Sequence, residues 1–432
     1  MPRLAIIDQI VSAGGGERFL QGLVEAFVKL PDGHDWEIHL LLRRHNSGGS
    51  VVRWPENLTR PNVHVRYLFD EGLGKLFYRL SRGGRILRIR GTARMQRIIP
   101  DVFKYYGPSS LRKFADARFW IEDYCKRQRF DAMYFSYPYL MECPVVSAPM
   151  VATPHDLNHK RHSSFGTLRS QIDREMPAWL HKSRRLVVSS DFTASELRHF
   201  YPDCAKKIRV VRPGIPGEDR LPSAELISRY AENAKLPPHF LLTPGWIIPH
   251  KNQKVVFEAL SDLRRRGIDI PLVCVGPNSA ELQPTHRGFR GAYLLEVLEC
   301  AKRLDLKYGR DFFGLGYVSD LDLECLYRLA TAVVMPTLYE AGSFPMREAI
   351  RARCPVICSR VAPIEEEVSL IGGNAWLFDP ADHKDLARRI EEVFANTALA
   401  QQRTARAAEL AAQVYSWKNM AAGYLSIFRE LF

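Results

Sequence analysis

The 432-residue chain lacks several features that would define its class at once. It contains no apolar run of the ~18–20 residues that a membrane-spanning helix needs. Its eight cysteines include no C-x-x-C pair, so the spacing indicates neither a zinc nor a redox site. Phe19 stands where a G-x-G-x-x-G turn would need its last glycine, which argues against a dinucleotide dehydrogenase. The start of the chain has no signal-peptide pattern, and we expect a cytoplasmic protein with free thiols.

The composition is that of an ordinary globular protein, with 46% hydrophobic and 25% charged residues, and the length predicts two domains. The net charge of +13 is unevenly distributed. Residues 1–215 hold 35 Lys/Arg against 21 Asp/Glu, whereas residues 216–432 hold 26 against 27. A stretch from Lys75 to Arg97 contains eight basic residues and no acidic one. The first half is therefore expected to meet an anionic partner, unless these charges form a solvated face.

Short apolar runs alternate with amphipathic stretches twice along the chain, and this alternation predicts two facing, doubly wound α/β domains. Polar residues between 210 and 238 predict the linker. We expect domains at 1–215 and 216–414, with ligands in the cleft at the carboxyl ends of the strands. The expected strands are 4–11, 36–42, 63–68, 132–137, 149–154, 186–190, 240–244, 272–276, 332–335 and 356–359. The expected helices begin at 17, 192, 253, 291, 321, 345 and 384, and residues 70–130 are expected to be mainly helical.

The segment from Pro336 to Ile350 carries two glutamates, Glu340 and Glu348, separated by seven residues across a strand-to-helix turn. Pro345 suits the first helical position, so Glu348 falls in the first turns of that helix. Backbone N–H groups near Ser343 are expected to hold an anion. A carboxylate can accept bonds from two adjacent hydroxyls, so the pair suits a sugar or a ribose. The alternative is two surface glutamates beside a helix cap.

This segment resembles the E-x7-E signature of the family-4 glycosyltransferases. The resemblance continues through the segments Gly14–Glu17, Ser189–Phe192, Pro244–Asn252, Phe313–Asp320, Ala362–Glu366, Phe378–Pro380 and Tyr415–Trp417. It covers the second half of the chain nearly throughout and the first half at islands. It implies the GT-B fold, with the donor on the second domain and the acceptor on the first. It also implies that a last helix, residues 415–432, packs back onto the first domain.

The resemblance implies roles for individual residues. Glu348 would bind the ribose hydroxyls, Glu340 the donor sugar, and Lys251 the diphosphate. The other residues implied to bind the donor are Gly15, Gly16, Gly245, Asn252, Tyr317, Val318, Gly342, Ser343 and Phe344. Two departures affect the donor site. The family usually has an arginine six positions before the lysine, where this chain has Gly245, and the usual G-F-G between the glutamates is Ala341-Gly342-Ser343.

His155 follows an apolar strand and resembles the histidine of the family's H-D element, which lies beside the reacting sugar. The alternative is a structural histidine. His159 follows four residues later, but no third ligand has suitable spacing, so we expect no zinc. Asp320 and Asp322 resemble a metal-binding D-x-D motif, yet the spacing that follows is helical. An N-cap with a first-turn acid explains them better, and we expect no metal and no cofactor.

The resemblance implies a retaining glycosyltransferase that moves a hexose from a nucleotide sugar to a glycan or lipid-linked acceptor, in the synthesis of cell-surface polysaccharide, and we expect it to be metal-independent. The Pro249–Asn252 turn resembles that of mannosyltransferases using GDP-mannose slightly more than that of others. Residues 73–99 could attach the protein to an anionic membrane, through an apolar stripe flanked by arginines. Two alternatives are an inactive, glycosyltransferase-like regulatory protein and, less favoured, a nucleic-acid-binding protein. The basic stretch has few interleaved aromatics, so we expect no nucleic acid partner.

Overall fold

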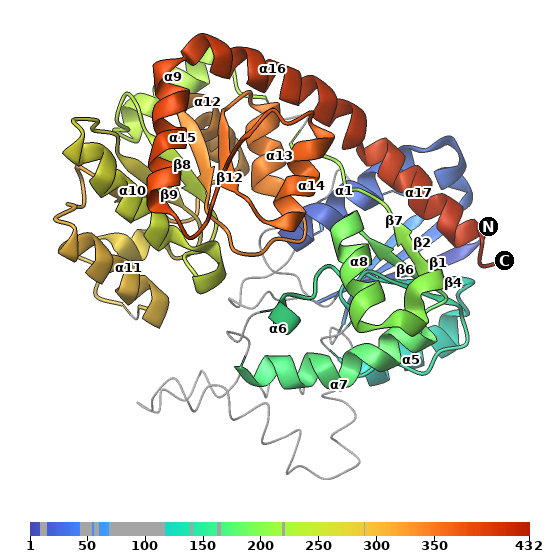
Figure 1. Ribbon diagram of the computed structural model, residues 1–432. Coiled ribbons are helices and arrows are strands. Elements are labelled where there is room, and N and C mark those ends of the chain that lie inside the picture. The colour runs from blue at the N-terminus through green and yellow to red at the C-terminus, as the bar shows by residue number, and fades with distance from the viewer. Residues whose placement is uncertain are drawn as a thin grey trace.

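The computed structural model describes residues 1–8, 15–43, 54–55, 60–68, 117–138, 141–161, 166–217, 221–288 and 290–432. Two parallel β-sheets with helices on their faces form two lobes (Figure 1). Each sheet has its own hydrophobic cores, and the chain passes between the lobes after residue 210 and again near residue 415. The expected architecture of two doubly wound α/β domains is confirmed.

The first sheet is formed by the N-terminal half of the chain, and all of its strand pairs are parallel. Its strand order is β3 (Val63–Leu68), β2 (Glu37–Arg43), β1 (Arg3–Asp8), β4 (Ala132–Phe135), β5 (Met150–Ala152), β6 (Arg185–Val188) and β7 (Ile208–Val210). The described helices of this half are α1 (Gly15–Lys29), α5 (Ala117–Gln128), α6 (Asn158–Arg161), α7 (Gly166–Lys182) and α8 (Asp191–Phe200). Helices cover both faces, so the central strands are apolar almost throughout.

The second sheet is also parallel. Its order is β10 (Phe312–Gly314), β9 (Leu272–Val275), β8 (Leu241–Pro244), β11 (Ala332–Met335), β12 (Val356–Ser359) and β13 (Trp376–Phe378). The helices of this half are α9 (Ala224–Asn233), α10 (Gln253–Arg265), α11 (Ala292–Arg303), α12 (Asp320–Leu329), α13 (Phe344–Arg351), α14 (Ala362–Leu370), α15 (His383–Ala395) and α16 (Thr397–Val414). Short 3-10 turns are η1 (Pro31–Asp35), η6 (Pro202–Lys207), η7 (Pro249–Lys251) and η8 (Ser279–Leu282).

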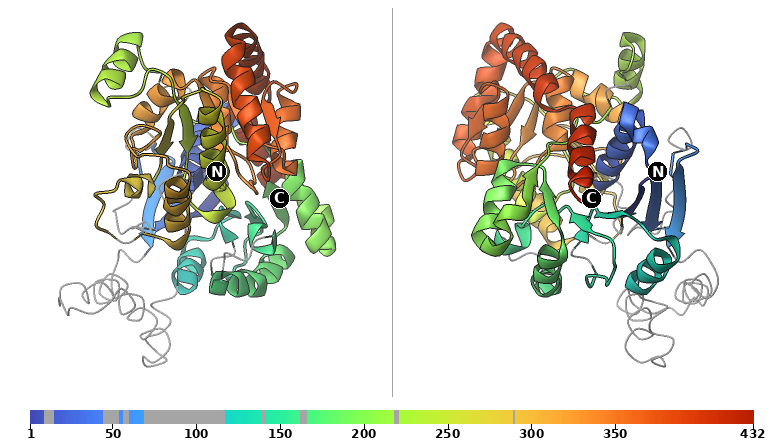
Figure 2. Two further views of the ribbon diagram at one scale, coloured as in Figure 1. Left: turned by 60° about the vertical axis from the view of Figure 1, so that its left-hand side comes forward. Right: turned by 90° about the vertical axis from the view of Figure 1, so that its right-hand side faces the viewer.

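The last helix, α17 (Trp417–Arg429), returns to the first lobe and lies beside α1 (Figures 1 and 2). Its apolar face enters the core under the first sheet through Tyr424 and Phe428, next to Phe27 of α1. The buried hydroxyls of Tyr134, Thr153 and Tyr424 lie within 3.1 Å of one another and tie the helix to β4 and β5. The ends of the chain therefore meet in one lobe.

In both sheets the strand order reverses once, between β1 and β4 and between β8 and β11. At such a reversal the loops leave the carboxyl ends of adjacent strands in opposite directions and open a crevice. The loop of residues 339–343, after β11, reaches across to the first lobe. The hydroxyls of Ser189 and Ser190 donate to the carbonyl of Ala341, at 3.3 and 3.2 Å. The Tyr339 hydroxyl donates to Glu196 at 2.7 Å.

Some expectations were incomplete. The polar stretch predicted as linker contains α9, which is capped by Ser223 and packs against α12. The predicted strand 4–11 is β1 as far as Asp8, and its remainder lies outside the described residues. Of the predicted helical region 70–130, the structure describes α5, and the basic stretch 73–99 lies outside the described residues. Within the described part of the chain, no helix is both long and apolar enough to cross a bilayer.

Candidate active site

A cavity of about 470 Å³ lies between the lobes, at the carboxyl ends of both sheets. It is called the cleft below. Eleven of the predicted site residues line it: Gly15, Gly16, His155, Gly245, Lys251, Tyr317, Val318, Glu340, Gly342, Phe344 and Glu348. Residues from both lobes thus converge on one cavity, as the strand pattern predicted.

Lys251 and Glu340, 89 positions apart, form an ion pair in the cleft, with 2.5 Å between Nζ and Oε2. Lys251 ends the turn η7 that follows β8, and Glu340 follows β11. Two hydrogen bonds to the His250 carbonyl hold these loops together, one from the Leu338 amide at 2.7 Å and one from the Thr337 hydroxyl at 3.1 Å. Both side chains are largely buried, so the pair is shielded from bulk water.

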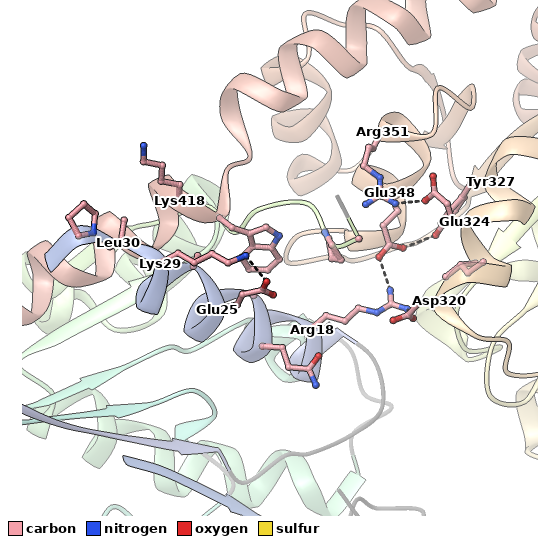
Figure 3. A pocket seen from close by; sticks show the side chains of 18 residues that line it. Arg18, Glu25, Lys29, Leu30, Asp320, Glu324, Tyr327, Glu348, Arg351 and Lys418 are labelled. Atoms are coloured by element: carbon pink, nitrogen blue, oxygen red, sulfur yellow. Dashed lines mark hydrogen bonds and ion pairs between the residues drawn. The ribbon is translucent and has the colours of Figure 1, made fainter. Parts of the chain in front are cut away.

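Glu348 lies on α13, which begins with Pro345 in its first turn and is capped by the Ser343 hydroxyl. Its two oxygens have different partners. Oε1 lies 2.6 Å from the Arg18 guanidinium, and Oε2 accepts from the Tyr327 hydroxyl at 3.0 Å. Burial raises the pKa of Glu348, whereas Arg18 and Tyr327 lower it. Figure 3 shows these side chains meeting from α1, α12 and α13.

The structure contradicts two of the predicted donor contacts. Ser343 is fully buried, its hydroxyl accepts from the Met346 amide, and its own amide donates to Glu367 at 2.8 Å. The prediction that Ser343 binds the donor and that its amide holds an anion is therefore wrong. Asn252 does not line the cleft. It takes a left-handed conformation (φ 53°) between η7 and α10, and its side-chain amide donates to the Pro380 carbonyl at 3.0 Å.

A third expectation concerned Asp320 as a helix N-cap. The cap of α12 is Ser319, whose hydroxyl accepts from the Asp322 amide at 3.1 Å. Asp322 is a first-turn acid, as expected, and Asp320 is a second first-turn acid instead of the cap. Asp320 forms an ion pair with Arg18, which links this turn to the first lobe. The pair explains the aspartate without a metal ion.

His155 lies at the cleft wall after β5, as predicted. Its ring packs against Phe19 and Tyr137, with centroids 5.0 and 4.2 Å apart. Burial lowers the pKa of His155 to about 4, so the ring is neutral at pH 7. Its Nε2 is buried and has no hydrogen-bond partner within the described structure. Next to it, burial, with Glu340 and Glu196 nearby, raises the pKa of Asp156 to about 6.

Close contacts with neighbouring atoms explain why glycine occupies several positions of the cleft. A Cβ at Gly16 would lie 2.8 Å from the Tyr137 hydroxyl. Gly245 has a φ of +118°. A Cβ at Gly276 would lie 2.2 Å from the carbonyl oxygen of Gly245. These close approaches within the protein leave no space for a side chain at Gly16 or Gly276. Tyr317 is 63% exposed at the rim of the cleft, and so is a residue that sequence reasoning missed, Trp246, at 52%.

Sequence reasoning also missed Arg18 and Tyr327. Arg18 is next to the glycine loop that the resemblance identified, but its partners Asp320 and Glu348 are 302 and 330 positions away. No local pattern reports such a contact. Tyr327 lies in the helix that follows the family segment Phe313–Asp320, one turn from Leu323, and an aromatic side chain there gives no sign of a site residue. Its hydroxyl is the polar part that reaches the site.

Among the described residues, one group outside the cleft has ligand atoms close enough for a metal ion: Glu37, His39 and His64. Arg3 already contacts two of the three. Its guanidinium lies 3.1 Å from Glu37 and 3.2 Å from Nε2 of His39. A cation at these distances opposes a second cation, so the cluster is best described as a hydrogen-bonded network at the start of β2.

Comparison with known proteins agrees with this architecture. The model "Glycosyltransferase Family 4" matches residues 13–218, and "Glycosyl transferases group 1" matches residues 227–410. A serotype-specific mannosyltransferase, WbdA of Escherichia coli, is 30% identical over 206 residues; the match covers 46% of this chain and 23% of WbdA. The O-antigen chain mannosyltransferase B of Escherichia coli is 26% identical over 264 residues, covering 60% of this chain and 64% of that protein.

Solved structures share the fold over the whole chain. Sucrose-phosphate synthase from Thermosynechococcus elongatus has a TM-score of 0.69 at 18% identity, covering 100% of this chain and 99% of its own. Anabaena HepE, solved in complex with UDP and glucose, has a TM-score of 0.69 at 16% identity, covering 99% and 100%. The two family models together match both lobes, in the order in which the lobes occur. The chain therefore belongs to the family-4 glycosyltransferases, with their GT-B fold.

Proposed function

We propose that the protein is a retaining, metal-independent glycosyltransferase that moves a hexose from a nucleotide sugar to a hydroxyl of a glycan or lipid-linked acceptor. The observation that carries the proposal is the convergence of the Lys251–Glu340 pair and Glu348 in one cleft between two α/β lobes. A nucleotide sugar has three recognition groups, namely a ribose, a diphosphate and a hexose. The cleft offers two carboxylates and an ammonium group, which supports a ligand of this kind.

In this proposal Glu348 accepts hydrogen bonds from the ribose hydroxyls, and Lys251 turns from Glu340 to the diphosphate when the hexose hydroxyls occupy Glu340. After the exchange Lys251 is paired with the diphosphate charge, and Glu340 accepts hydrogen bonds from the neutral sugar hydroxyls. A fixed ammonium group in a site shielded from water stabilises the negative charge that grows on the departing nucleotide. The absence of an arginine at Gly245 leaves Lys251 as the cation after β8 that serves the phosphates.

For the transfer itself we propose a front-face displacement. The bond between the sugar's anomeric carbon and the phosphate oxygen breaks, the acceptor oxygen bonds to the same face, and the acceptor proton passes to the departing phosphate. His155, neutral at pH 7, suits a hydrogen-bonding role beside the sugar, through its unpartnered Nε2. No step is assigned to a metal, and we expect full activity in excess EDTA.

The two mannosyltransferase relatives support GDP-mannose as donor and cell-surface polysaccharide as the pathway product. The HepE complex with UDP and glucose makes UDP-glucose the main competitor. The test is a thermal-shift screen of GDP-mannose, UDP-glucose and related nucleotide sugars, followed by NMR assignment of the product anomer. A donor at 100 times its Kd adds about 2.7 kcal/mol to the free energy of unfolding. No shift and no turnover with any of these donors would contradict the proposal and favour an inactive regulatory protein.

We also propose attachment at the cytoplasmic face of an anionic membrane through residues 73–99. The support is the cluster of arginines with interspersed apolar residues and the excess of basic residues in the first half. Co-sedimentation with phosphatidylglycerol vesicles, reversed by high salt, tests it. Replacement of Arg82, Arg85, Arg88 and Arg90 by glutamine should abolish sedimentation and leave donor affinity unchanged. A protein that ignores such vesicles at low ionic strength would refute the attachment.

A further inference from the structure

Arg18 belongs to the first lobe, but its ion-pair partners belong to the second. It lies in the first turn of α1, directly after the glycine loop. Its guanidinium reaches Glu348 of α13, at 2.6 Å, and Asp320 of α12. Figure 3 shows the side chain extending from α1 across to the two acids. The three groups that act on it electrostatically, Asp320, Tyr327 and Glu348, all come from the other lobe.

Arg18 also separates two cavities. Behind the cleft, a second cavity of about 590 Å³ lies between α1, the chain near Gly217, α12, α13 and the start of α17 (Figure 3). The residues that line both cavities are Arg18, Leu323, Tyr327 and Glu348. The Glu348 carboxylate therefore lies in the wall between the two cavities. A donor would bind on the cleft side of this wall, and Arg351 and Glu324 pair on the side of the second cavity.

Glu348 needs a counter-ion to be charged at this position. Its side chain is 5% exposed, and burial alone favours the neutral form of a carboxyl group. The charged or titratable groups facing it are Arg18 from α1, Tyr327 and Asp320 from α12, and Arg351 from its own helix. Arg351 already pairs with Glu324, and Asp320 opposes ionisation. Arg18 is thus the cation in direct contact with the carboxylate.

The geometry leaves the carboxylate free to bind more. A carboxylate has about four lone-pair sites, and here Arg18 takes one on Oε1 and Tyr327 one on Oε2. One site on each oxygen remains, which suits the two adjacent hydroxyls of a ribose. Charge-assisted hydrogen bonds are about twice as strong as neutral ones, so the ribose gains most when Glu348 is ionised.

We propose that Arg18 is a positioning residue of the donor site: it keeps the Glu348 carboxylate charged and aimed so that the nucleotide ribose is recognised only when both lobes come together. This inference rests on the proposed role of Glu348. The carboxylate and its counter-ion lie on different lobes, so opening the cleft separates them. Ribose recognition and lobe closure are therefore coupled through one ion pair.

The test compares the ribo and 2′,3′-dideoxy forms of GDP or UDP, whichever the wild type binds more tightly, by calorimetry near pH 6 and near pH 9. The ratio of the two Kd values measures the contribution of the ribose hydroxyls to binding, because phosphate ionisation changes the Kd of both ligands alike. The variants are Arg18→Gln and Arg18→Lys. The matched control is Lys29→Gln, which removes a cation of the same helix and the same second cavity that pairs with Glu25.

We expect the wild type and Lys29→Gln to favour the ribo form by about tenfold to hundredfold at both pH values. Arg18→Gln should lose this preference near pH 6 and regain it near pH 9, since the unpaired carboxyl then ionises only at higher pH. Arg18→Lys should keep the preference. If Arg18→Gln does not fold, Arg18→Met, which retains an apolar stem, is expected to show the same loss.

Wild-type preference in Arg18→Gln near pH 6 would overturn the inference while leaving the role of Glu348 intact. A wild type that binds both forms equally would instead overturn the role of Glu348, and the inference with it. The two failures are thus distinguished by the wild type alone.

Discussion

Lys251 and Glu340 neutralise each other across the cleft, with 2.5 Å between the ammonium nitrogen and a carboxylate oxygen. The family resemblance assigns the two residues to different parts of the donor, Lys251 to the diphosphate and Glu340 to the sugar. In this structure each is the ion-pair partner of the other. A donor that separates them must supply both a replacement anion, the diphosphate, and replacement hydrogen-bond donors, the sugar hydroxyls. The pair thus favours a molecule that carries both groups.

Lys251→Ala should lower kcat far more than it raises KM for the donor. The charge that Lys251 meets grows as the nucleotide departs, so its loss affects mainly the transition state. Losing one such electrostatic contact costs about 10²–10³ in kcat. Steady-state kinetics measure both constants. Lys254→Ala is the matched control, because Lys254 lies on the next helix, α10, and pairs with the exposed Glu296. A Lys251→Ala enzyme with wild-type kcat would refute the role.

His155 should titrate near pH 4 rather than in the neutral range, because burial disfavours its charged form. An unfolded histidine has a pKa of about 6.5, so between these values the unfolded chain binds a proton that the folded chain does not. The contribution of His155 to the free energy of unfolding is therefore largest above about pH 6.5 and is lost as the pH falls toward about 4. NMR of the ring measures the titration, and a midpoint near 6.5 would contradict the burial argument.

The variant His155→Asn distinguishes function from packing. If the Nε2 atom serves the sugar, kcat should fall strongly while the melting temperature at pH 7 changes little. The acid-side loss of stability should also become smaller than in the wild type, since the titrating group is gone. Full activity in this variant would make His155 a structural residue.

Sequence patterns located the central strands of both sheets but missed β7, β10 and β13. Each of these strands has three residues and lies at the edge of its sheet. Edge strands pair on one side only and need no long apolar run, so their pattern is weak. Helix α16 was missed for another reason. Its buried stripe consists of small side chains, Ala400, Thr404, Ala407 and Ala411, which do not stand out as an apolar periodicity.

The candidate site could be predicted in part. Glu340, Glu348, Lys251 and His155 follow strands or open a helix, so their place at the carboxyl edge of a sheet was visible in the pattern. The orientation of Ser343 was not visible, because its amide donates to Glu367, which lies on α14 and not in the cleft. Partners that arise only from the packing of two lobes, as for Arg18, leave no local trace.

Arg347→Met should destabilise the second lobe by about 3–5 kcal/mol, because it leaves a buried carboxylate without its cation. Arg347 and Glu367 are 2% and 5% exposed and lie 3.0 Å apart, and Glu367 also accepts from the Ser343 amide. Urea unfolding measures the loss. Adding Glu367→Gln should recover part of it, since the amide oxygen still accepts from Ser343 and no charge is left buried. A double variant no more stable than Arg347→Met would count against the ion-pair explanation.

The last prediction concerns the joint between the lobes. The Trp417 ring lies against Gly22 of α1 and Gly214 of the crossing chain, and its Nε1 donates to the Ile215 carbonyl at 2.9 Å. A Cβ at Gly214 would come within 2.4 Å of the ring and 2.5 Å of the Trp417 backbone nitrogen. Because backbone cannot move aside as a flexible side chain does, Gly214→Ala should cost about 1–3 kcal/mol of stability.

Gly214→Ala should also weaken donor binding, since Trp417 helps to hold α17 against the lobe that supplies Arg18 and His155. Gly291→Ala is the control: its Cβ would meet nothing within 4 Å and its φ is −65°, so the change removes only a glycine helix cap and should cost less than about 1 kcal/mol. Urea unfolding and calorimetry with the donor nucleotide measure the two effects separately. If Gly214→Ala loses stability but binds the nucleotide as the wild type does, the joint stabilises the fold without setting the geometry of the cleft. If it loses neither, the close contact with Trp417 is relieved by a small shift, and the two lobes tolerate displacement at their joint.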